Sequence, residues 1–218
     1  MKKILFILLF IFIVSINAAT IEFFDENDFR NAAGEYDLVD FENYASGTVL
    51  SGNEYQNVGL TIVNNGGGVM KAYDPNTSWC NIYPWNTNGL YGDPGSTYHA
   101  DFDFILDAPV RSGGLWLIDT HWNSYTIQFL TEDNQVIAQQ DFGPAYSNLG
   151  ASTPNGSGVM FFYGITTDMG IKKIRSIDSQ YGEWIAIDNI HIGTSIPEPL
   201  NLALLILGMV SIFVCKKK

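Results

Sequence analysis

The chain alternates short apolar stretches with turn-forming residues over most of its length. Ala100–Leu106 reads ADFDFIL, and such alternation of polar and apolar side chains is typical of a strand with one buried face. Glycine and proline lie mostly between these stretches, where turns are expected. The pattern predicts strands at 20–24, 38–41, 59–63, 69–73, 100–106, 115–119, 125–130, 136–141, 158–162, 171–177 and 185–192.

These strands predict one all-β domain over residues 20–195. About eleven short strands at this spacing are typical of a β-sandwich, and we expect a jelly-roll-like arrangement. One short helix is expected at 25–33, because Asp25 can cap its first turn and Gly34 can end it. The stretch 74–99 is too rich in Asn, Pro and Gly for regular structure, and we expect a long loop there.

The amino-terminal end has a different character from the body. Two lysines precede an apolar run from Ile4 to Ile16, and Ala18 and Ala19 then offer small residues for cleavage. This order predicts a secretory signal peptide at 1–19, and a retained membrane anchor is the alternative. The run is short for an anchor, which favours the signal peptide.

The carboxy-terminal end, 196–218, is also apolar. A helix over Leu200–Cys215 has 16 residues and spans about 24 Å, which is enough to cross a bilayer when flanking lysines reach the headgroups. The three terminal lysines favour a cytoplasmic position, so the body is held on the far side of the membrane. The alternative, a buried core helix, would not end the chain on Lys-Lys-Lys.

The order of features at this end resembles the PEP-CTERM sorting signal. Pro197, Glu198 and Pro199 come first, followed by the apolar helix and the basic cluster. The resemblance implies export machinery and an exosortase-like processing enzyme as partners. It implies a transient inner-membrane anchor, cleavage near the motif, and release to the cell surface or the extracellular matrix of a bacterium that makes exopolysaccharide. The two prolines keep the motif extended, as a protease-like enzyme requires.

Composition narrows the possible functions. The 218 residues carry 11 Lys and Arg against 23 Asp and Glu, a net charge of −12, and five of the bases lie at the two ends. An acidic body of this kind argues against nucleic acid as a partner. The two cysteines, Cys80 and Cys215, lie in the body and at the membrane edge, so they do not pair with each other. Cys80 is expected to be a buried inert thiol or to form an intermolecular disulfide.

Two short motifs suggest a cation site. Asp40 and Glu42 flank Phe41, which alternation places inward, and Asp188 with Asn189 follows an apolar run near the end. The pair of motifs is similar to MAM-type and carbohydrate-module jelly rolls, in which early and late strands lie side by side. A buried carboxylate needs a partner, and Ca²⁺, with its preference for oxygen ligands, is one candidate. Backbone amides or Arg and Lys side chains are the alternative partners.

Aromatic residues suggest a second kind of site. Flat rings stack on sugar faces, and nearby Asn and Asp can bond hydroxyl groups. A carbohydrate-binding surface is therefore possible, and packing of the rings beneath the long loop is the alternative. The candidate rings are Trp79, Tyr83, Trp85, Trp122 and Tyr125.

Catalytic motifs are scarce. The chain has three histidines and lacks the Gly-x-Ser-x-Gly, His-Glu-x-x-His and Cys-x-x-Cys patterns. His99 and Asp101 are expected on one side of a strand, and Asp101 with Asp103 is a carboxylate pair of the kind used in glycoside hydrolysis. With so many acidic residues, such pairs arise by chance. We therefore expect an exported, non-catalytic surface or extracellular-matrix protein, then a carbohydrate-binding module, and last a hydrolase.

Overall fold

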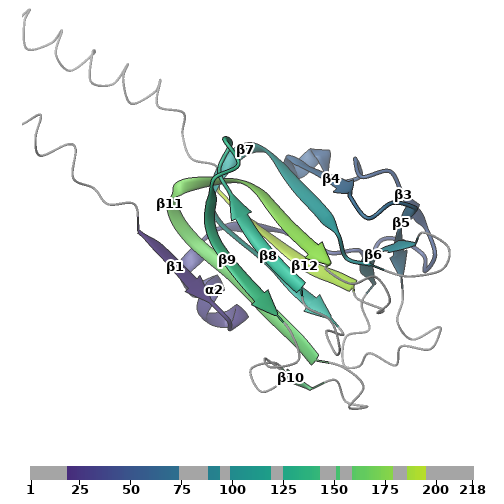
Figure 1. Cartoon of the computed structure of the whole chain (residues 1–218), viewed down its shortest axis with the longest axis horizontal. Coiled ribbons are helices and arrows are strands. Elements are labelled where there is room, and N and C mark those ends of the chain that lie inside the picture. Colours follow the sequence, from purple (N-terminus) through teal and green to yellow (C-terminus); the bar gives the residue numbers. More distant parts are fainter. Residues whose placement is uncertain are drawn as a thin grey trace, which may run out of the picture.

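The computed structural model describes residues 19–73, 88–93, 99–118, 125–142, 151–152, 159–178 and 186–194. In this part of the chain the structure is mostly β-strand with one α-helix, which confirms the all-β prediction at that level (Figure 1). The predicted signal peptide up to Ala18, the sorting motif and the predicted transmembrane helix 200–215 lie outside the described residues. Among the residues described, no helix is long and apolar enough to cross a membrane.

The predicted helix is present as α2, Glu26–Ala33. The Asp25 carboxylate caps it by accepting from the backbone N–H groups of Asn27 and Asp28, at 2.8 and 3.0 Å. Gly34 ends it with a φ of 74°, a conformation that favours glycine. The prediction of this helix from its end signals is therefore confirmed.

Within the described ranges, twelve strands join one hydrogen-bonded sheet. Eight follow the order β3-β5-β6-β12-β7-β11-β8-β9, while β1 and β10 pair with β11, β2 pairs with β12 and β4 pairs with β7. The elements are β1 (Thr20–Phe23), β2 (Tyr36–Val39), β3 (Val49–Leu50), the 3₁₀ helix η1 (Gln56–Val58), β4 (Leu60–Asn64), β5 (Val69–Tyr73), β6 (Gly89–Asp93), β7 (Phe102–Ile118), β8 (Tyr125–Leu130), β9 (Val136–Phe142), β10 (Ala151–Ser152), β11 (Val159–Asp178) and β12 (Ala186–Gly193).

Two long strands differ from the prediction of short ones. The ranges 100–106 and 115–119 belong to one strand, β7, and 158–162 and 171–177 belong to β11. Partners change along these strands: the first half of β7 pairs with β4, and the second half pairs with β12. β11 has register shifts between Thr166 and Lys173, where it passes from one half of the sheet to the other.

One apolar core joins the two halves of the sheet. It contains Ile62 from β4 and Phe129 from β8 together with Ile187 from β12. Gly113 lies in the second half of β7, and a Cβ there would come 3.1 Å from Ile174 Cδ1 and 3.4 Å from Phe129 Cε1. Side chains from β4, β7, β8, β11 and β12 therefore meet in a single core.

Helix α2 packs against the strands through a second group of aromatic residues. Its Phe29 is fully buried, and the ring lies 5.9 Å from Phe23 and 5.3 Å from Phe162. Such ring pairs add to the free energy gained from burial alone. The helix is thus fixed by its centre as well as by its capped end.

The predicted loop 74–99 is wrong in part, because it contains β6. Leu90 is fully buried and Tyr91 is 7% exposed, so this strand contributes to the core. It pairs with β5 over its whole length, from Tyr73 opposite Gly89 to Val69 opposite Asp93. Long-range pairing overrides the local preference of a Gly-rich sequence.

Candidate functional site

The two motifs proposed for a cation lie next to each other. β2 pairs with β12, with Val39 opposite Ile190, so the expected adjacency of the early and late strands is confirmed. Phe41 points inward and is fully buried, as alternation predicts. Asp188 is also fully buried, whereas the Glu42 side chain is exposed.

Protein groups bind the oxygens at this junction. Glu42 Oε1 accepts the backbone N–H of Asn88 at 2.7 Å, and Asp188 Oδ1 accepts the N–H of Asn189 at 2.7 Å. Asp40 Oδ1 accepts the N–H of Glu42 at 3.4 Å. Asn189 has a φ of 48°, and the pairing of β12 with β7 shifts register there, so the chain forms a local irregularity at this point.

Tyr55 completes the junction. Its hydroxyl donates to the backbone carbonyl of Asp40. Burial raises the pKa of Tyr55, and the nearby Tyr44 and the carboxylates of Asp40 and Asp188 raise it further. The described residues include no group of three or more His, Cys, Asp or Glu side chains placed to hold a metal ion. The calcium site stays a prediction, and the hydrogen bonds of Glu42, Asp188 and Asp40 support backbone amides as partners.

The predicted aromatic site falls largely outside the described residues. Trp79, Tyr83, Trp85 and Trp122 lie there, as does Cys80. Tyr125 is described, and its place on a sugar-binding surface is wrong, because its exposed fraction is 0%. It begins β8 opposite Phe142 and Asp178, where its ring is part of the core.

His99 serves the fold rather than an open site. It is fully buried, and its Nδ1 accepts the N–H of Asp101 at 3.2 Å while its Nε2 lies 3.0 Å from the carbonyl oxygen of Gly67. Both ring nitrogens therefore contact backbone groups of neighbouring segments. The residue lies before β7 and joins the Gly-rich bend to the start of that strand.

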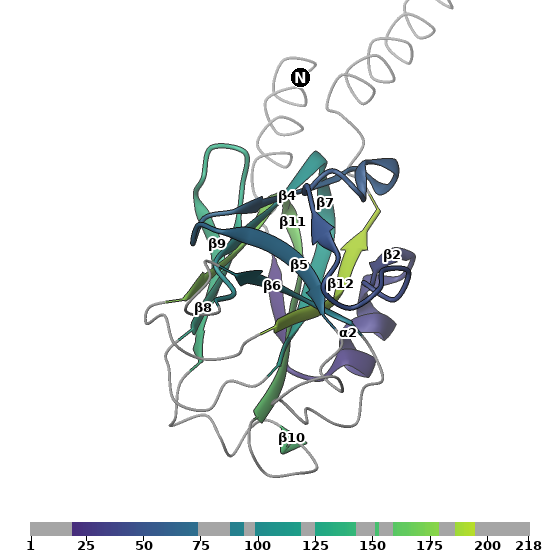
Figure 2. The same cartoon turned by 90° about the vertical axis from the view of Figure 1, so that its right-hand side faces the viewer.

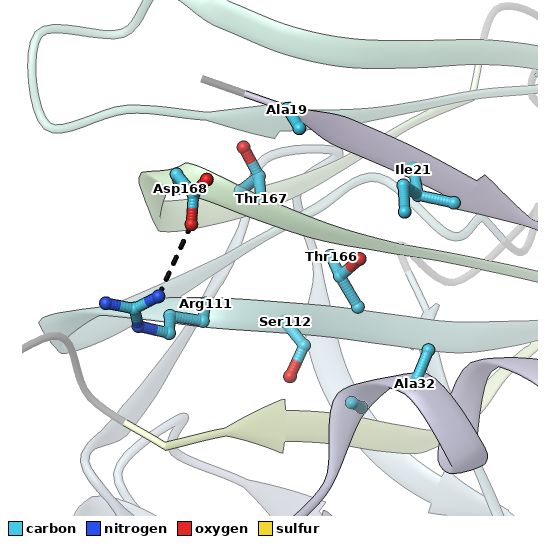
Figure 3. A pocket seen from close by; sticks show the side chains of 9 residues that line it. Ala19, Ile21, Ala32, Arg111, Ser112, Thr166, Thr167 and Asp168 are labelled. Carbon is cyan, nitrogen blue, oxygen red and sulfur yellow. Dashed lines mark hydrogen bonds and ion pairs between the residues drawn. The ribbon is translucent and has the colours of Figure 1, made fainter. Parts of the chain in front are cut away.

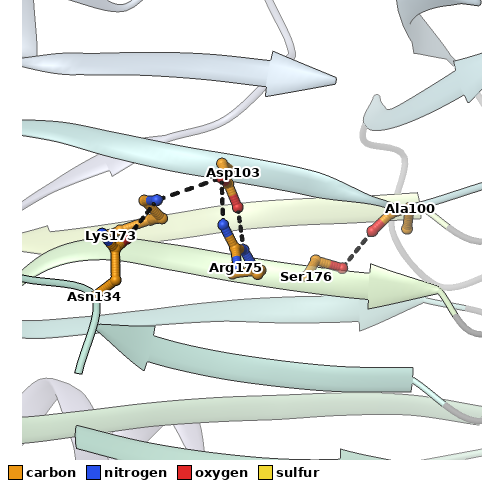
Figure 4. Close-up of polar contacts among 6 residues, drawn as sticks. All are labelled: Ala100, Asp103, Asn134, Lys173, Arg175 and Ser176. Carbon is orange, nitrogen blue, oxygen red and sulfur yellow. Dashed lines mark hydrogen bonds and ion pairs between the residues drawn. The ribbon is translucent and has the colours of Figure 1, made fainter. Parts of the chain in front are cut away.

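The surroundings of Asp101 and Asp103 shift the pKa values of the two carboxylates in opposite directions. Arg175 donates to both oxygens of Asp103, at 2.7 and 2.9 Å, and Lys173 Nζ lies 3.5 Å away (Figure 4). Burial acts to raise the pKa of Asp103, but the hydrogen bonds and charge of Arg175 outweigh it, and the pKa lies below its usual value. Burial raises the pKa of Asp101, with a further rise from the charge of Asp103.

This pairing limits what the two carboxylates can do. Opposed pKa shifts are what acid and base roles in glycoside hydrolysis require. Asp103, however, is held by two cations at the centre of the sheet, on strands β7 and β11. The two-point bond to Arg175 engages both oxygens of Asp103, as expected of an ion pair that stabilises the sheet.

Sequence reasoning missed one polar cluster, between α2 and the sheet. Glu26 Oε1 lies 3.0 Å from Nε2 of His191, and Glu26 Oε2 accepts the indole N–H of Trp116 at 3.2 Å. The contact with His191 lowers the pKa of Glu26, against the opposing effect of burial. His191 is fully buried among the rings of Phe29 and Tyr36. In the sequence, Glu26 is an acidic residue in the first turn of a helix. Such residues are common there, so this one gave no indication of a buried partner.

Both ends of the described body meet at the bend of β7 and β11. The backbone N–H of Arg111 donates to the carbonyl of Thr194 at 3.3 Å, and that of Asp168 donates to the carbonyl of Ala19 at 3.4 Å. Arg111 and Asp168 also contact each other through their side chains (Figure 3). The chain therefore enters and leaves the body at one end, which we call the bend end.

Comparison of the chain with protein-family models, with curated proteins and with solved structures found no match.

Proposed function

We propose that this chain is an exported, non-catalytic protein of the cell surface or extracellular matrix, delivered by a PEP-CTERM-type signal at 196–218. The observation that supports it is the bend end. Ala19 adjoins the amino-terminal apolar segment and Thr194 precedes the carboxy-terminal one by a few residues, and both lie at this end. Two apolar segments that leave one end of a body can enter the same membrane.

The opposite end of the body would then face away from the membrane. β12 runs from Ala186 to Gly193, and its start pairs with Ile118 far from the bend. In Figure 2 the turn between β8 and β9 points to one end of the body, and β10 lies at the other. An exosortase-like enzyme would cut near Pro197-Glu198-Pro199 and release the body from its transient anchor.

For the body itself we propose a jelly-roll-like β-sandwich. Support comes from the single core between the two halves of the sheet and from the pairing of β2 with β12. Antiparallel pairing throughout the described strands agrees with this class.

Replacement of Pro197, Glu198 and Pro199 by alanine tests the sorting role in a host that has the processing enzyme. We expect full-length protein to accumulate in the membrane fraction, because the extended recognition segment is lost. A variant that lacks 200–218 is the control, and it is expected to be exported without a membrane stage. Normal release of the alanine variant would reject the proposal.

A carbohydrate-binding module is the second candidate. Asn88, Ile118 and Tyr125 flank the segments that carry the candidate rings, and they lie away from the bend end. Ile118 pairs with Ala186, the first residue of β12, and a Cβ on Gly89 would come 2.7 Å from the Ala186 Cβ. These three described residues thus lie at the end of the body away from its proposed tether, where a polysaccharide would be met.

Retention on immobilised exopolysaccharide tests this second candidate. We expect Trp79→Ala and Trp85→Ala each to weaken retention about tenfold, which corresponds to a loss of about 1.4 kcal/mol of binding free energy. Phe24→Ala is the control, because Phe24 is also an exposed ring, at 52%, but it stands between β1 and α2 and is stacked on Tyr163. Equal retention of all variants would exclude a role for these rings.

A further inference from the structure

The first described residue lies opposite a carboxylate. β1 pairs with β11 so that Thr20 faces Thr167. One step further out, Ala19 faces Asp168, and its carbonyl accepts the Asp168 N–H at 3.4 Å. The backbone of Ala19 is therefore part of the sheet edge, although the residue stands just before the strand.

A pocket opens at this position. It has a volume of about 300 Å³, and its wall includes Ala19, Ile21, Arg111, Thr167 and Asp168 (Figure 3). Asp168 contacts Arg111 Nη1 at 3.3 Å, and its side chain keeps 50% of its surface exposed. The Asp168 carboxylate is therefore half exposed in the wall of a pocket that Ala19 also lines, and it has room for a second cationic partner beside Arg111.

Two cleavage positions fit the small residues of the amino-terminal segment. Cleavage after Ala19 would remove the residue whose carbonyl receives the Asp168 N–H. Cleavage after Ala18 keeps that bond, and it creates a new amino group on the residue that faces Asp168. An ammonium group so placed meets a carboxylate across a strand pair, where opposite charges stabilise the sheet.

We propose that a protease of the signal-peptidase class cuts the Ala18–Ala19 bond and that the α-ammonium of Ala19 then forms an ion pair with Asp168. The inference rests on the proposed export of this chain, and it places the end of the signal peptide one residue earlier than the range 1–19 predicted from sequence. The mature amino terminus becomes a structural part of the bend end.

The cleavage is a hydrolysis. Water adds to the carbonyl carbon of Ala18, the bond from that carbon to the Ala19 nitrogen breaks, and the nitrogen leaves with a proton. The products are a carboxylate on Ala18 and, after proton transfer to the amine, an ammonium on Ala19. An α-amino group in water has a pKa of about 7.7–8.0, so it is mostly charged at neutral pH.

The first test is the amino-terminal sequence of the exported protein. The full-length chain is expressed in a Gram-negative host, recovered from the cell envelope, and its first residue is determined by intact mass and sequencing. Ala19 is the expected first residue, and any other first residue overturns the inference. Export with Thr20 first would overturn it alone, whereas uncut protein in the cytosol would also contradict the proposed function.

The second test measures the ion pair. The rate at which an amine-reactive reagent modifies the α-amino group is followed against pH, by mass spectrometry of the first peptide. Asp168→Asn is expected to increase the rate at neutral pH roughly threefold, which corresponds to a pKa lower by about half a unit. Asp107→Asn, at another exposed acid of the bend, is the control and should leave the rate unchanged. Equal rates in the Asp168 variant and the unchanged protein would overturn the ion pair.

Discussion

At the scale of single residues, Asp101 and Asp103 show how two neighbouring carboxylates acquire different roles. Asp103 has a side chain that is 10% exposed and meets the Arg175 guanidinium at two points. Two-point pairing with arginine is among the strongest polar contacts in proteins. Asp101 is partly buried beside the buried His99 and receives no such cation. One carboxylate is stabilised in its charged form, and the other is not.

We therefore expect opposite effects from two matched substitutions. Asp103→Asn should lower the free energy of unfolding at neutral pH by about 2 kcal/mol, because Arg175 and Lys173 lose their counter-charge in a partly buried place. Asp101→Asn should be neutral or stabilising, because it removes a charge that burial disfavours. Denaturant unfolding of both variants checks this, and a larger loss for Asp101→Asn would contradict it.

The pH dependence of these two variants has opposite signs. The folded pKa of Asp103 is lowered, so its contribution is present above the ordinary value of about 3.9 and is lost as pH falls through the folded pKa. The folded pKa of Asp101 is raised, so its charged form opposes folding at neutral pH and stops doing so as pH falls through that pKa. Unfolding curves between neutral and strongly acidic pH separate the two.

Glu42 provides a second test at this scale. Its carboxylate accepts the Asn88 N–H at 2.7 Å, and Glu42→Ala should cost about 1 kcal/mol for the loss of this exposed, charged contact. Glu42→Gln keeps an acceptor and is the control. We expect the same loss in the presence of EDTA. A melting temperature that EDTA lowers in the unchanged protein, but not in Glu42→Ala, would instead establish Glu42 as a calcium ligand.

At the scale of elements, the strands with clear alternation were predictable and the long ones were not. β5 and β8 have the predicted bounds, and α2 differs by one residue at its start. β7 was divided because Asp107-Ala108-Pro109 and a pair of glycines interrupt its pattern, as they would in a loop. In the folded chain the interruption is a bend within a strand, because partners on both sides continue the pairing. Those partners, β11 and β12, are distant in the sequence, so the residues near the bend do not by themselves indicate that the strand continues.

The glycines around His99 show how β6 depends on such partners. A Cβ on Gly92 would come 2.2 Å from the imidazole Cε1, and one on Gly66 would come 2.3 Å from it. The ring cannot move aside easily, because the Asp101 N–H and the Gly67 carbonyl hold both of its nitrogens. The His99 ring thus lies between the backbone at Gly66 and the backbone at Gly92, and neither position leaves space for a side chain.

Gly92→Ala is accordingly expected to lower the free energy of unfolding by about 1–3 kcal/mol through overpacking. In a His99→Ala background the same substitution should cost little, since the clash is gone. A double-mutant cycle measured by denaturant unfolding gives the coupling. Additive costs would show that His99 is not what excludes a side chain at position 92.

At the scale of the whole molecule, the bend end could not be predicted from the sequence. Which strands neighbour each other depends on pairings such as Thr20 with Thr167, which are far apart in the chain. The sequence indicated two apolar ends and a β body between them. It did not indicate that Arg111 and Asp168, at two bends, would bring both exits to the same place.

This proximity predicts that the body tolerates circular permutation. A linker of about six residues spans up to roughly 20 Å and should join Thr194 to Ala19, with new ends placed in the exposed β8–β9 turn between Asp133 and Asn134. We expect a strand-rich circular dichroism spectrum and one cooperative thermal transition, lower than that of the 19–194 body by several degrees, or about 1–2 kcal/mol.

Opening the chain between Gly113 and Gly114 is the control, and it should abolish cooperative unfolding because β7 is paired on both sides there. An unfolded first permutant beside a folded 19–194 body would contradict the placement of both exits at the bend end.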